Sequence, residues 1–187
     1  TIYKIMANLV YSISDACVFQ TEEARDFFGR RVKSKSVIIL NPVSSEFYKQ
    51  HNSLIKGNVV SLGRLEECKN FQLLISAFSK ICNEFPDDNL LIYGEGTIRT
   101  KLEEQIKTLS LENRVYLPGR VNDVAEKIRD AKVYVLSSNY EGLPNGLMEA
   151  MALGIPVVST DCPCGGPDLL LEHGKYGILT HVNNEEE

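Results

Sequence analysis

The sequence lacks the features of a membrane-spanning or secreted protein. No apolar run approaches the roughly 18 residues that a transmembrane helix requires. The first 15 residues are amphipathic and contain no small-residue cleavage site, so they do not form a secretory signal. They also lack an initiator Met, which leads us to expect that the chain is a piece of a longer one.

Cysteine and histidine are too few and too scattered to predict a metal site or a disulfide framework. The five cysteines are an odd number without regular spacing, which is typical of a protein in the reducing cytoplasm. Cys162 and Cys164 form a Cys-Pro-Cys pair, but a zinc site needs more ligands at ordered spacing. We therefore expect no metal and a cytoplasmic location.

An excess of positive charge is also absent. The formal net charge is −5, which argues against nucleic acid as the main partner. Apolar residues make up 43% of the chain, an ordinary share for a globular protein with a sizeable core. A chain of 187 residues has room for one large domain, or for one domain and part of another.

The second part of the sequence contains strands that alternate with helices. The expected strands are 59–62, 90–93, 115–117, 133–136 and 155–158. The expected helices are 70–85, 97–109, 123–130 and 145–153. The apolar runs are continuous rather than alternating, so we predict strands that are buried on both faces. The fold class is α/β, with a parallel sheet covered by helices on both faces.

Residues 1–42 form a shorter unit of the same kind. Its expected elements are a helix over 5–13, a strand over 16–20, a helix capped by Thr21 and ending near Gly29, and a strand over 37–40. We interpret this unit as the end of a domain that lies mostly outside the chain. Residues 43–57 are polar and irregular, so we expect a linker there.

Ligands of an open parallel sheet bind where the strands end. Gly63, Arg64 and Lys69 follow the first strand of the larger unit, and glycine permits close approach while the two cations match phosphate oxygens. Taken alone, both cations are better interpreted as solvated surface charges. Further candidates follow the next strands: Gly94 and Gly96, then Gly119, Arg120 and Val121.

The loop from Glu141 to Glu149 carries more information. The backbone N–H groups at the start of helix 145–153 would form an anion site. A carboxylate accepts two hydrogen bonds from adjacent hydroxyls, so Glu149 suits a ribose and Glu141 a sugar. Both acids could instead face solvent. Glu149, however, lies in an otherwise apolar helix, where a charge is rarely buried without a partner.

Two stretches resemble a known family. EGLPNGLME at 141–149, followed by AMALGIPVVSTD, resembles the donor-binding motif of the family 4 retaining glycosyltransferases. GRLEECKN at 63–70 is similar to that family's Gly-Arg-Leu…Lys-Asn element. Shorter matches in the same order extend the resemblance over nearly the whole chain: DACVFQT at 15–21, VIILNP at 37–42, LIYGEG at 91–96 and VYLPGRVND at 115–123.

The resemblance implies a GT-B fold, in which two Rossmann-like domains face each other across a cleft. Residues 1–42 would be a remnant of the acceptor-side N-terminal domain. Residues 43–187 would be the donor-binding Rossmann-like domain, without its C-terminal helix. The implied donor is a nucleotide-diphospho-sugar, with a UDP-sugar expected, and the implied reaction transfers the sugar with retention and without a metal or other cofactor.

The resemblance also implies a role for each site residue. Arg64 and Lys69 would neutralise the donor diphosphate and its growing charge, helped by the backbone N–H groups of Asn145 and Gly146. Glu149 would hold the ribose, and Glu141 would contact the transferred sugar rather than act as a nucleophile. The backbone near Val121 would meet the base. The remaining members of the expected donor-binding set are Gly63, Gly142 and Leu143.

The sequence departs from the family pattern at several places. Pro144 stands where many relatives have Gly, which removes one backbone donor, and Asn41-Pro42 replaces the usual Asn-Gly at the interdomain hinge. The acceptor-side glycine loop and any catalytic histidine have no counterpart. We therefore expect weak donor binding and no turnover by this chain alone.

Two other functions remain open at this stage. One is a sugar-nucleotide epimerase of the same fold, although it would lack the combination of Arg64, Lys69, Glu141 and Glu149. The other is a non-catalytic nucleotide-binding or scaffold module. The acceptor, a sugar polymer or a lipid-linked sugar, cannot be read from these residues.

A basic stretch could indicate what kind of acceptor the protein uses. It consists of Arg25, Arg30, Arg31, Lys33 and Lys35. It is either a solvated loop or a surface that contacts the inner face of an anionic membrane in the full-length protein. The second interpretation would favour a lipid-linked acceptor.

Overall fold

The computed structural model describes residues 2–48 and 57–187, so most of the expected linker 43–57 lies outside the described residues. Six parallel strands form the main sheet, in the order β5-β4-β3-β6-β7-β8. Their bounds are β3 Val59–Leu62, β4 Leu90–Tyr93, β5 Val115–Gly119, β6 Val133–Leu136, β7 Val157–Thr160 and β8 Ile178–Thr180. The chain builds β3 to β5 outward in one direction and β6 to β8 in the other, so the order reverses between β3 and β6.

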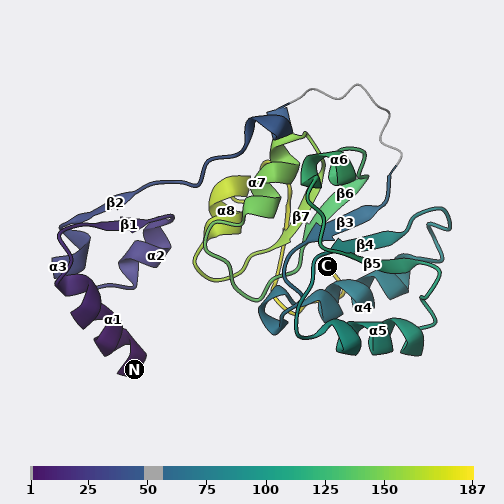
Figure 1. Cartoon of the computed structure of the whole chain (residues 1–187), viewed down its shortest axis with the longest axis horizontal. Helices are drawn as coiled ribbons and strands as arrows, with labels where there is room; N and C mark the ends of the chain where they lie inside the picture. The colour runs from purple at the N-terminus through teal and green to yellow at the C-terminus, as the bar shows by residue number, and fades with distance from the viewer. Residues whose placement is uncertain (1, 49–56) are drawn as a thin grey trace.

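Helices cover both faces of this sheet (Figure 1). Their bounds are α4 Phe71–Ile81, α5 Arg99–Thr108, α6 Val124–Ile128, α7 Asn145–Ala152 and α8 Gly166–Leu171. One apolar core lies between β3, β4, β5 and the helices α4 and α5. A second core packs α6, α7 and α8 against β3, β6 and β7. The two cores bury the strands on both faces, which confirms the expected fold class.

Residues 2–38 form a smaller unit that lies to one side of the main sheet (Figure 1). It contains α1 Ile2–Ser12, β1 Cys17–Phe19, α2 Glu22–Asp26, α3 Arg30–Lys33 and β2 Ser36–Ile38, and the chain then passes to the larger unit, where it forms the 3-10 turn η1 Ser45–Tyr48. β1 and β2 pair in parallel. Thr21 caps α2 as expected, because its side chain accepts a hydrogen bond from the Ala24 N–H. η1 rests on α7, where Phe47 is buried.

Several expected element bounds were wrong. The helix over 70–85 ends at Ile81, because the Arg114 guanidinium binds the carbonyls of Cys82 and Phe85 and so favours a turn there. The strand expected over 155–158 is β7, which begins two residues later, at Val157. Gly154 adopts a φ of 74° and Ile155 N–H donates to Ala150, so these residues close the end of α7 instead.

The basic stretch is not a loop. Arg30 and Lys33 lie in α3, and Lys33 and Arg25 both form ion pairs with Asp26. α8 and β8 were not expected, since each is short and follows the Cys-Pro-Cys-Gly-Gly turn. Within residues 2–48 and 57–187, no helix has both the length and the apolarity to cross a membrane.

Candidate functional site

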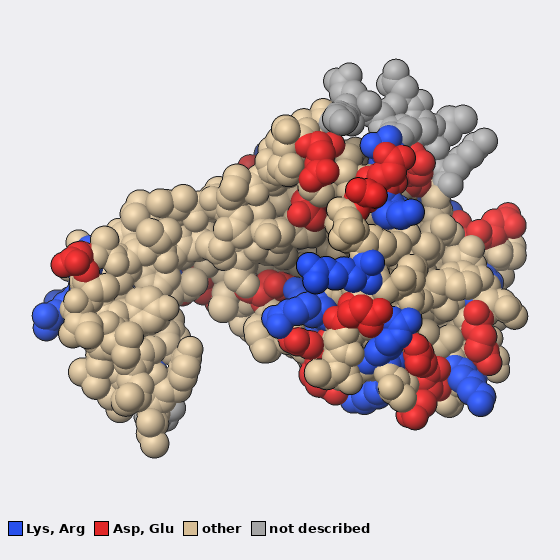
Figure 2. All heavy atoms as spheres, in the orientation of Figure 1, with Lys and Arg blue, Asp and Glu red and all other residues tan. Residues whose placement is uncertain are grey.

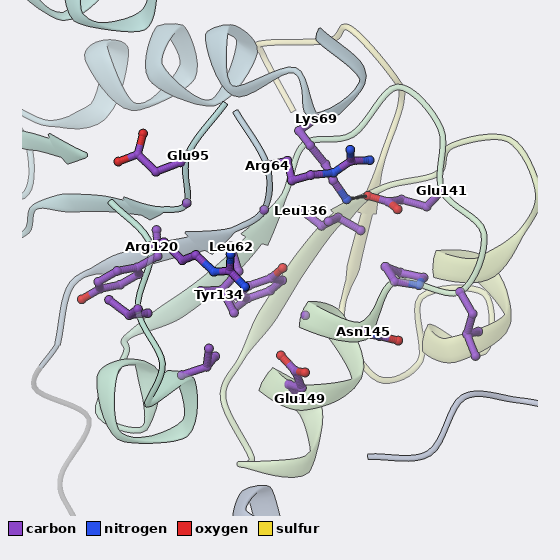
Figure 3. A pocket seen from close by; sticks show the side chains of 18 residues that line it. Leu62, Arg64, Lys69, Glu95, Arg120, Tyr134, Leu136, Glu141, Asn145 and Glu149 are labelled. Carbon is purple, nitrogen blue, oxygen red and sulfur yellow. Dashed lines mark hydrogen bonds and ion pairs between the residues drawn. The ribbon is translucent and has the colours of Figure 1, made fainter. Parts of the chain in front are cut away.

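A cavity of about 680 Å³ opens at the carboxyl ends of β3, β4, β5 and β6. It therefore lies where the strand order reverses, which is where open α/β sheets bind ligands. The residues that line it are Leu62, Gly63, Arg64, Lys69, Tyr93, Gly94, Glu95, Arg120, Val121, Val124, Tyr134, Leu136, Glu141, Leu143, Pro144, Asn145, Gly146 and Glu149. Figure 3 shows cations and carboxylates from different loops that converge on this space.

The structure brings the expected donor-binding residues together. Every member of that set except Gly142 lines the cavity. Gly142 lies beside it, and its carbonyl approaches Gly166 so closely that a β-carbon on Gly166 would be 1.8 Å from that oxygen. Loop 141–144 thus packs directly against the first residue of α8.

The N-terminus of α7 points its backbone at the cavity. Pro144 precedes the helix and provides no side-chain cap, and Asn145 and Gly146 are its first residues. Both of these residues line the cavity. Their N–H groups belong to the first turn of a helix, which has no intrahelical acceptors for them and carries partial positive charge. This end of α7 is therefore suited to an anion.

Lys69 and Glu141 form an ion pair across the cavity wall. Lys69 Nζ is 2.5 Å from Glu141 Oε1, and Ser138 Oγ donates to the same oxygen at 2.7 Å. Their side chains are only 20% and 12% exposed. Lysine has three N–H donors, and the carboxylate has a second oxygen, so both groups retain bonding capacity toward a ligand. The two residues are 72 positions apart, and their pairing was not anticipated from the sequence.

Two arginines lie at the rim of the cavity. Arg64 is 76% exposed and pairs with Glu66 at 3.0 Å, so its guanidinium can reorient at little cost. Arg120 follows β5, and no ion pair joins it to another of the described residues. Arg120 was predicted from the sequence to lie at this edge of the sheet, but no role was predicted for it. Its position after a strand and a glycine was the available signal.

Glu149 projects from α7 into the cavity (Figure 3). Its carboxylate is half-buried and has no hydrogen-bond or ion-pair partner within residues 2–48 and 57–187. Burial, with a smaller contribution from the Glu46 charge, raises the pKa of Glu149 above its usual value. A ligand that donates hydrogen bonds would offset this cost.

Tyr134 is a cavity residue that sequence reasoning missed. Its ring is fully buried in β6, and its hydroxyl has no hydrogen-bond partner among the described residues. Burial raises the pKa of Tyr134, and the backbone of Leu62 opposes this effect weakly. A β-carbon at Gly146 would lie 2.5 Å from the tyrosine oxygen. Glycine at 146 therefore lets α7 begin directly above Tyr134.

Gly94 and Gly96 allow two loops of the cavity to meet. A β-carbon on Gly94 would lie 1.8 Å from the Gly63 carbonyl, and one on Gly96 would lie 2.3 Å from the Leu65 carbonyl. The Gly-x-Gly pattern, a weak signal in the sequence, thus permits β4 and its loop to support the loop that carries Arg64. No group of three His, Cys, Asp or Glu side chains suited to a metal ion occurs in the described parts of the chain.

Known proteins are similar to this chain in sequence and in fold. A family model described as "Glycosyl transferases group 1" matches residues 44–187. An uncharacterized glycosyltransferase of Methanocaldococcus jannaschii is 33% identical over 94% of this chain and 50% of its own length. A Campylobacter jejuni N-acetylgalactosaminyltransferase, named for a diphospho-undecaprenol-linked substrate, is 34% identical over 68% of this chain and 34% of its own.

A solved structure agrees with these matches. Staphylococcus aureus TarM, described in complex with UDP, is 28% identical, with a TM-score of 0.78 over 92% of this chain and 35% of TarM. The similarity confirms the expected GT-B type of fold. The chain spans about half the length of the two curated glycosyltransferases that are 33% and 32% identical over nearly all of it. Because the family model spans well over half of the sequence, this chain belongs to the group 1 glycosyl transferases.

Proposed function

We propose that the cavity binds a nucleotide-diphospho-sugar, with a UDP-sugar as the expected donor. The observation that carries the proposal is the division of charge in the cavity. The start of α7, Arg64 and Lys69 offer positive charge for a diphosphate, while Glu141 and Glu149 offer acceptors for hydroxyl groups. The UDP named with TarM supports the same class of ligand.

Each expected contact then has a physical reason. Arg64, Lys69 and the N–H groups of Asn145 and Gly146 would stabilise the diphosphate and the charge that grows on it as it leaves. Glu149 would accept hydrogen bonds from the ribose, which would offset the burial of its carboxylate. Glu141, held by Lys69, would present its second oxygen to the sugar.

The remaining contacts concern the base and the backbone. The backbone near Val121 would meet the base. Gly63 and Gly142 would let loop backbones approach the donor closely, and Leu143 would complete the donor-binding set.

In the whole protein, the reaction would be transfer of a glycosyl group with retention of configuration, as in the family 4 enzymes. We propose that residues 1–42 belong to an acceptor-side domain and residues 43–187 to the donor-side domain. The acceptor would be a polysaccharide or a lipid-linked sugar, and the name of the Campylobacter relative supports the second class. Metal independence and a cytoplasmic location remain predictions.

Calorimetric titration with UDP, GDP and ADP tests the donor site. We expect UDP to bind selectively, and Glu149→Ala to weaken binding by about 1–3 kcal/mol because ribose hydroxyls lose their acceptor. Exposed Glu84 lies in the turn after α4, outside the cavity, so Glu84→Ala is a matched control that should leave affinity unchanged. Absence of selective nucleotide binding would contradict the proposal and favour a scaffold role. Conversion of the UDP-sugar to its epimer would favour the epimerase alternative.

A further inference from the structure

Three side-chain amides connect the smaller unit to the cavity loop. Gln20 follows β1, Asn41 follows β2, and Asn145 is the first residue of α7. Gln20 Nε2 donates to Asn41 Oδ1 at 2.5 Å, and Asn41 Nδ2 donates to Asn145 Oδ1 at 2.8 Å. At the other end, the Leu143 N–H donates to Gln20 Oε1 at 3.3 Å. We call Gln20, Asn41 and Asn145 the amide relay.

The direction of the relay is determined by its backbone end. A backbone N–H can only donate, so the Leu143 N–H requires Gln20 to present its oxygen there. Gln20 then turns its NH₂ group to Asn41, and Asn41 in turn turns its NH₂ group to Asn145. The oxygen of Asn145 therefore accepts from Asn41. The NH₂ group of Asn145 has no hydrogen-bond partner among residues 2–48 and 57–187, and Asn145 lines the cavity.

Loop 142–145 is closely fitted around this relay. A β-carbon at Gly142 would lie 3.1 Å from Gln20 Oε1, so glycine permits the approach of the glutamine. Leu143 and Pro144 are buried, while Asn145 is exposed toward the cavity. The relay thus joins both ends of the loop, at Leu143 and at Asn145, to the smaller unit.

We propose that Gln20 and Asn41 are positioning residues of the donor site. They hold the Asn145 amide with its NH₂ group toward the cavity, where it donates to a diphosphate oxygen beside the N–H groups of α7. An inverted Asn145 amide would present an acceptor to the same anion and weaken its binding. This inference rests on the proposed function, because it assumes that the ligand carries a diphosphate.

A second attachment provides a matched control. Glu23 Oε1 accepts a hydrogen bond from the Cys164 N–H at 3.3 Å, so it joins the same two units of the chain without touching the relay. Glu23→Ala should loosen this attachment, because it removes the acceptor of the Cys164 N–H, while it leaves the Asn145 amide in place. Comparing the relay variants with the Glu23 variant separates two effects: the orientation of the Asn145 amide, and the general attachment of the smaller unit to the larger one.

The test is calorimetric titration of the whole chain with UDP. Gln20→Met and Asn41→Ala should each weaken UDP binding about 10-fold, the effect of losing one hydrogen bond to a charged group. The double variant should lose no more than either single variant, because both break the same relay. Glu23→Ala should stay within about twofold of the wild type, and thermal melting shows whether each variant is folded.

Three results would overturn the inference. These are single variants that bind as tightly as the wild type, losses that add in the double variant, or an equal loss in Glu23→Ala. In each of them the wild-type chain still binds UDP, so the proposed function stands. Absence of UDP binding by the wild-type chain would overturn both the proposed function and the relay.

Discussion

Glu149 combines a stability cost with a proposed role in donor binding. Its pKa is raised above the usual value of 4.5, so the native state retains the proton to a higher pH than the unfolded state does. The free energy of unfolding therefore falls as the pH rises from about 4.5 through the native pKa. Above that interval the ionised, half-buried carboxylate disfavours the native state.

Glu149→Gln should therefore stabilise the chain at neutral pH. We expect its melting temperature at pH 7 to rise by up to about 2–4 °C, the change that roughly 1 kcal/mol produces at this size. The gain should vanish below about pH 4, where the carboxyl group is protonated in both states. Thermal melts of both proteins across this range provide the measurement. A gain that persists in acid would contradict the electrostatic explanation.

The contact between Tyr134 and Gly146 gives a second prediction for single residues. Gly146→Ala places a methyl group 2.5 Å from the buried tyrosine oxygen, so we expect a loss of about 1–3 kcal/mol of unfolding free energy. Tyr134→Phe removes a hydroxyl that has no partner among the described residues, and should be neutral or stabilising.

The double variant Gly146→Ala/Tyr134→Phe should recover most of the loss, because the phenylalanine makes room for the methyl group. Urea denaturation of the four proteins completes the cycle. Additive effects would show that the two residues do not act through this contact.

Among the elements, the loops that follow β3 and β4 pack against each other at a single glycine, Gly94. A β-carbon at Gly94 would lie 1.8 Å from the Gly63 carbonyl, and the φ of Gly94 is 148°. Gly94→Ala should separate the two loops, displace Arg64 and Lys69, and cost at least about 1–3 kcal/mol. We expect UDP affinity to fall together with stability.

Gly154→Ala is the matched control for the loop prediction. Gly154 also has a positive φ, of 74°, but a β-carbon there would meet nothing within 4 Å. The Gly154→Ala variant should lose about 1 kcal/mol of unfolding free energy through backbone strain, without losing UDP affinity. Urea melts and calorimetry on both variants would reveal the difference. Equal effects on affinity would argue against the loop contact.

At the scale of the whole molecule, the distribution of surface charge bears on membrane binding. Figure 2 shows basic and acidic side chains interspersed on the visible face of the larger unit. Within the basic stretch 25–35, Lys35 binds the backbone carbonyls of Ser12 and Ser14, and Arg25 and Lys33 are paired with acids. Exposed Arg30 and Arg31 remain without an ion pair within the described ranges.

Membrane binding by this surface should therefore be weak. Two arginines near an anionic bilayer contribute about 1 kcal/mol each. We expect cosedimentation with phosphatidylserine vesicles at low salt and its loss near 0.15 M salt. Arg30→Gln/Arg31→Gln should abolish it, whereas Lys107→Gln/Lys127→Gln, which removes two exposed charges elsewhere, should not. No binding at low salt would argue against a membrane role for the stretch.

Local patterns accounted for most of the elements. Strands 59–62, 90–93 and 133–136 were predicted with their observed bounds, because each is a short apolar run next to a glycine or polar turn. The bounds that failed depend on distant or cooperative contacts. The end of α4 follows Arg114, and the start of β7 follows the closing turn of α7 at Gly154.

The local pattern of residues is enough to predict a parallel α/β sheet and the residues that gather at one edge of it. Continuous apolar runs require burial on both faces, and parallel strands all end at the same edge. Tertiary structure alone decided the strand order, the ion pair of Lys69 with Glu141, and the amide relay that ends at Asn145. These contacts join residues tens of positions apart, and their partners are determined by how the chain folds back on itself rather than by any local pattern.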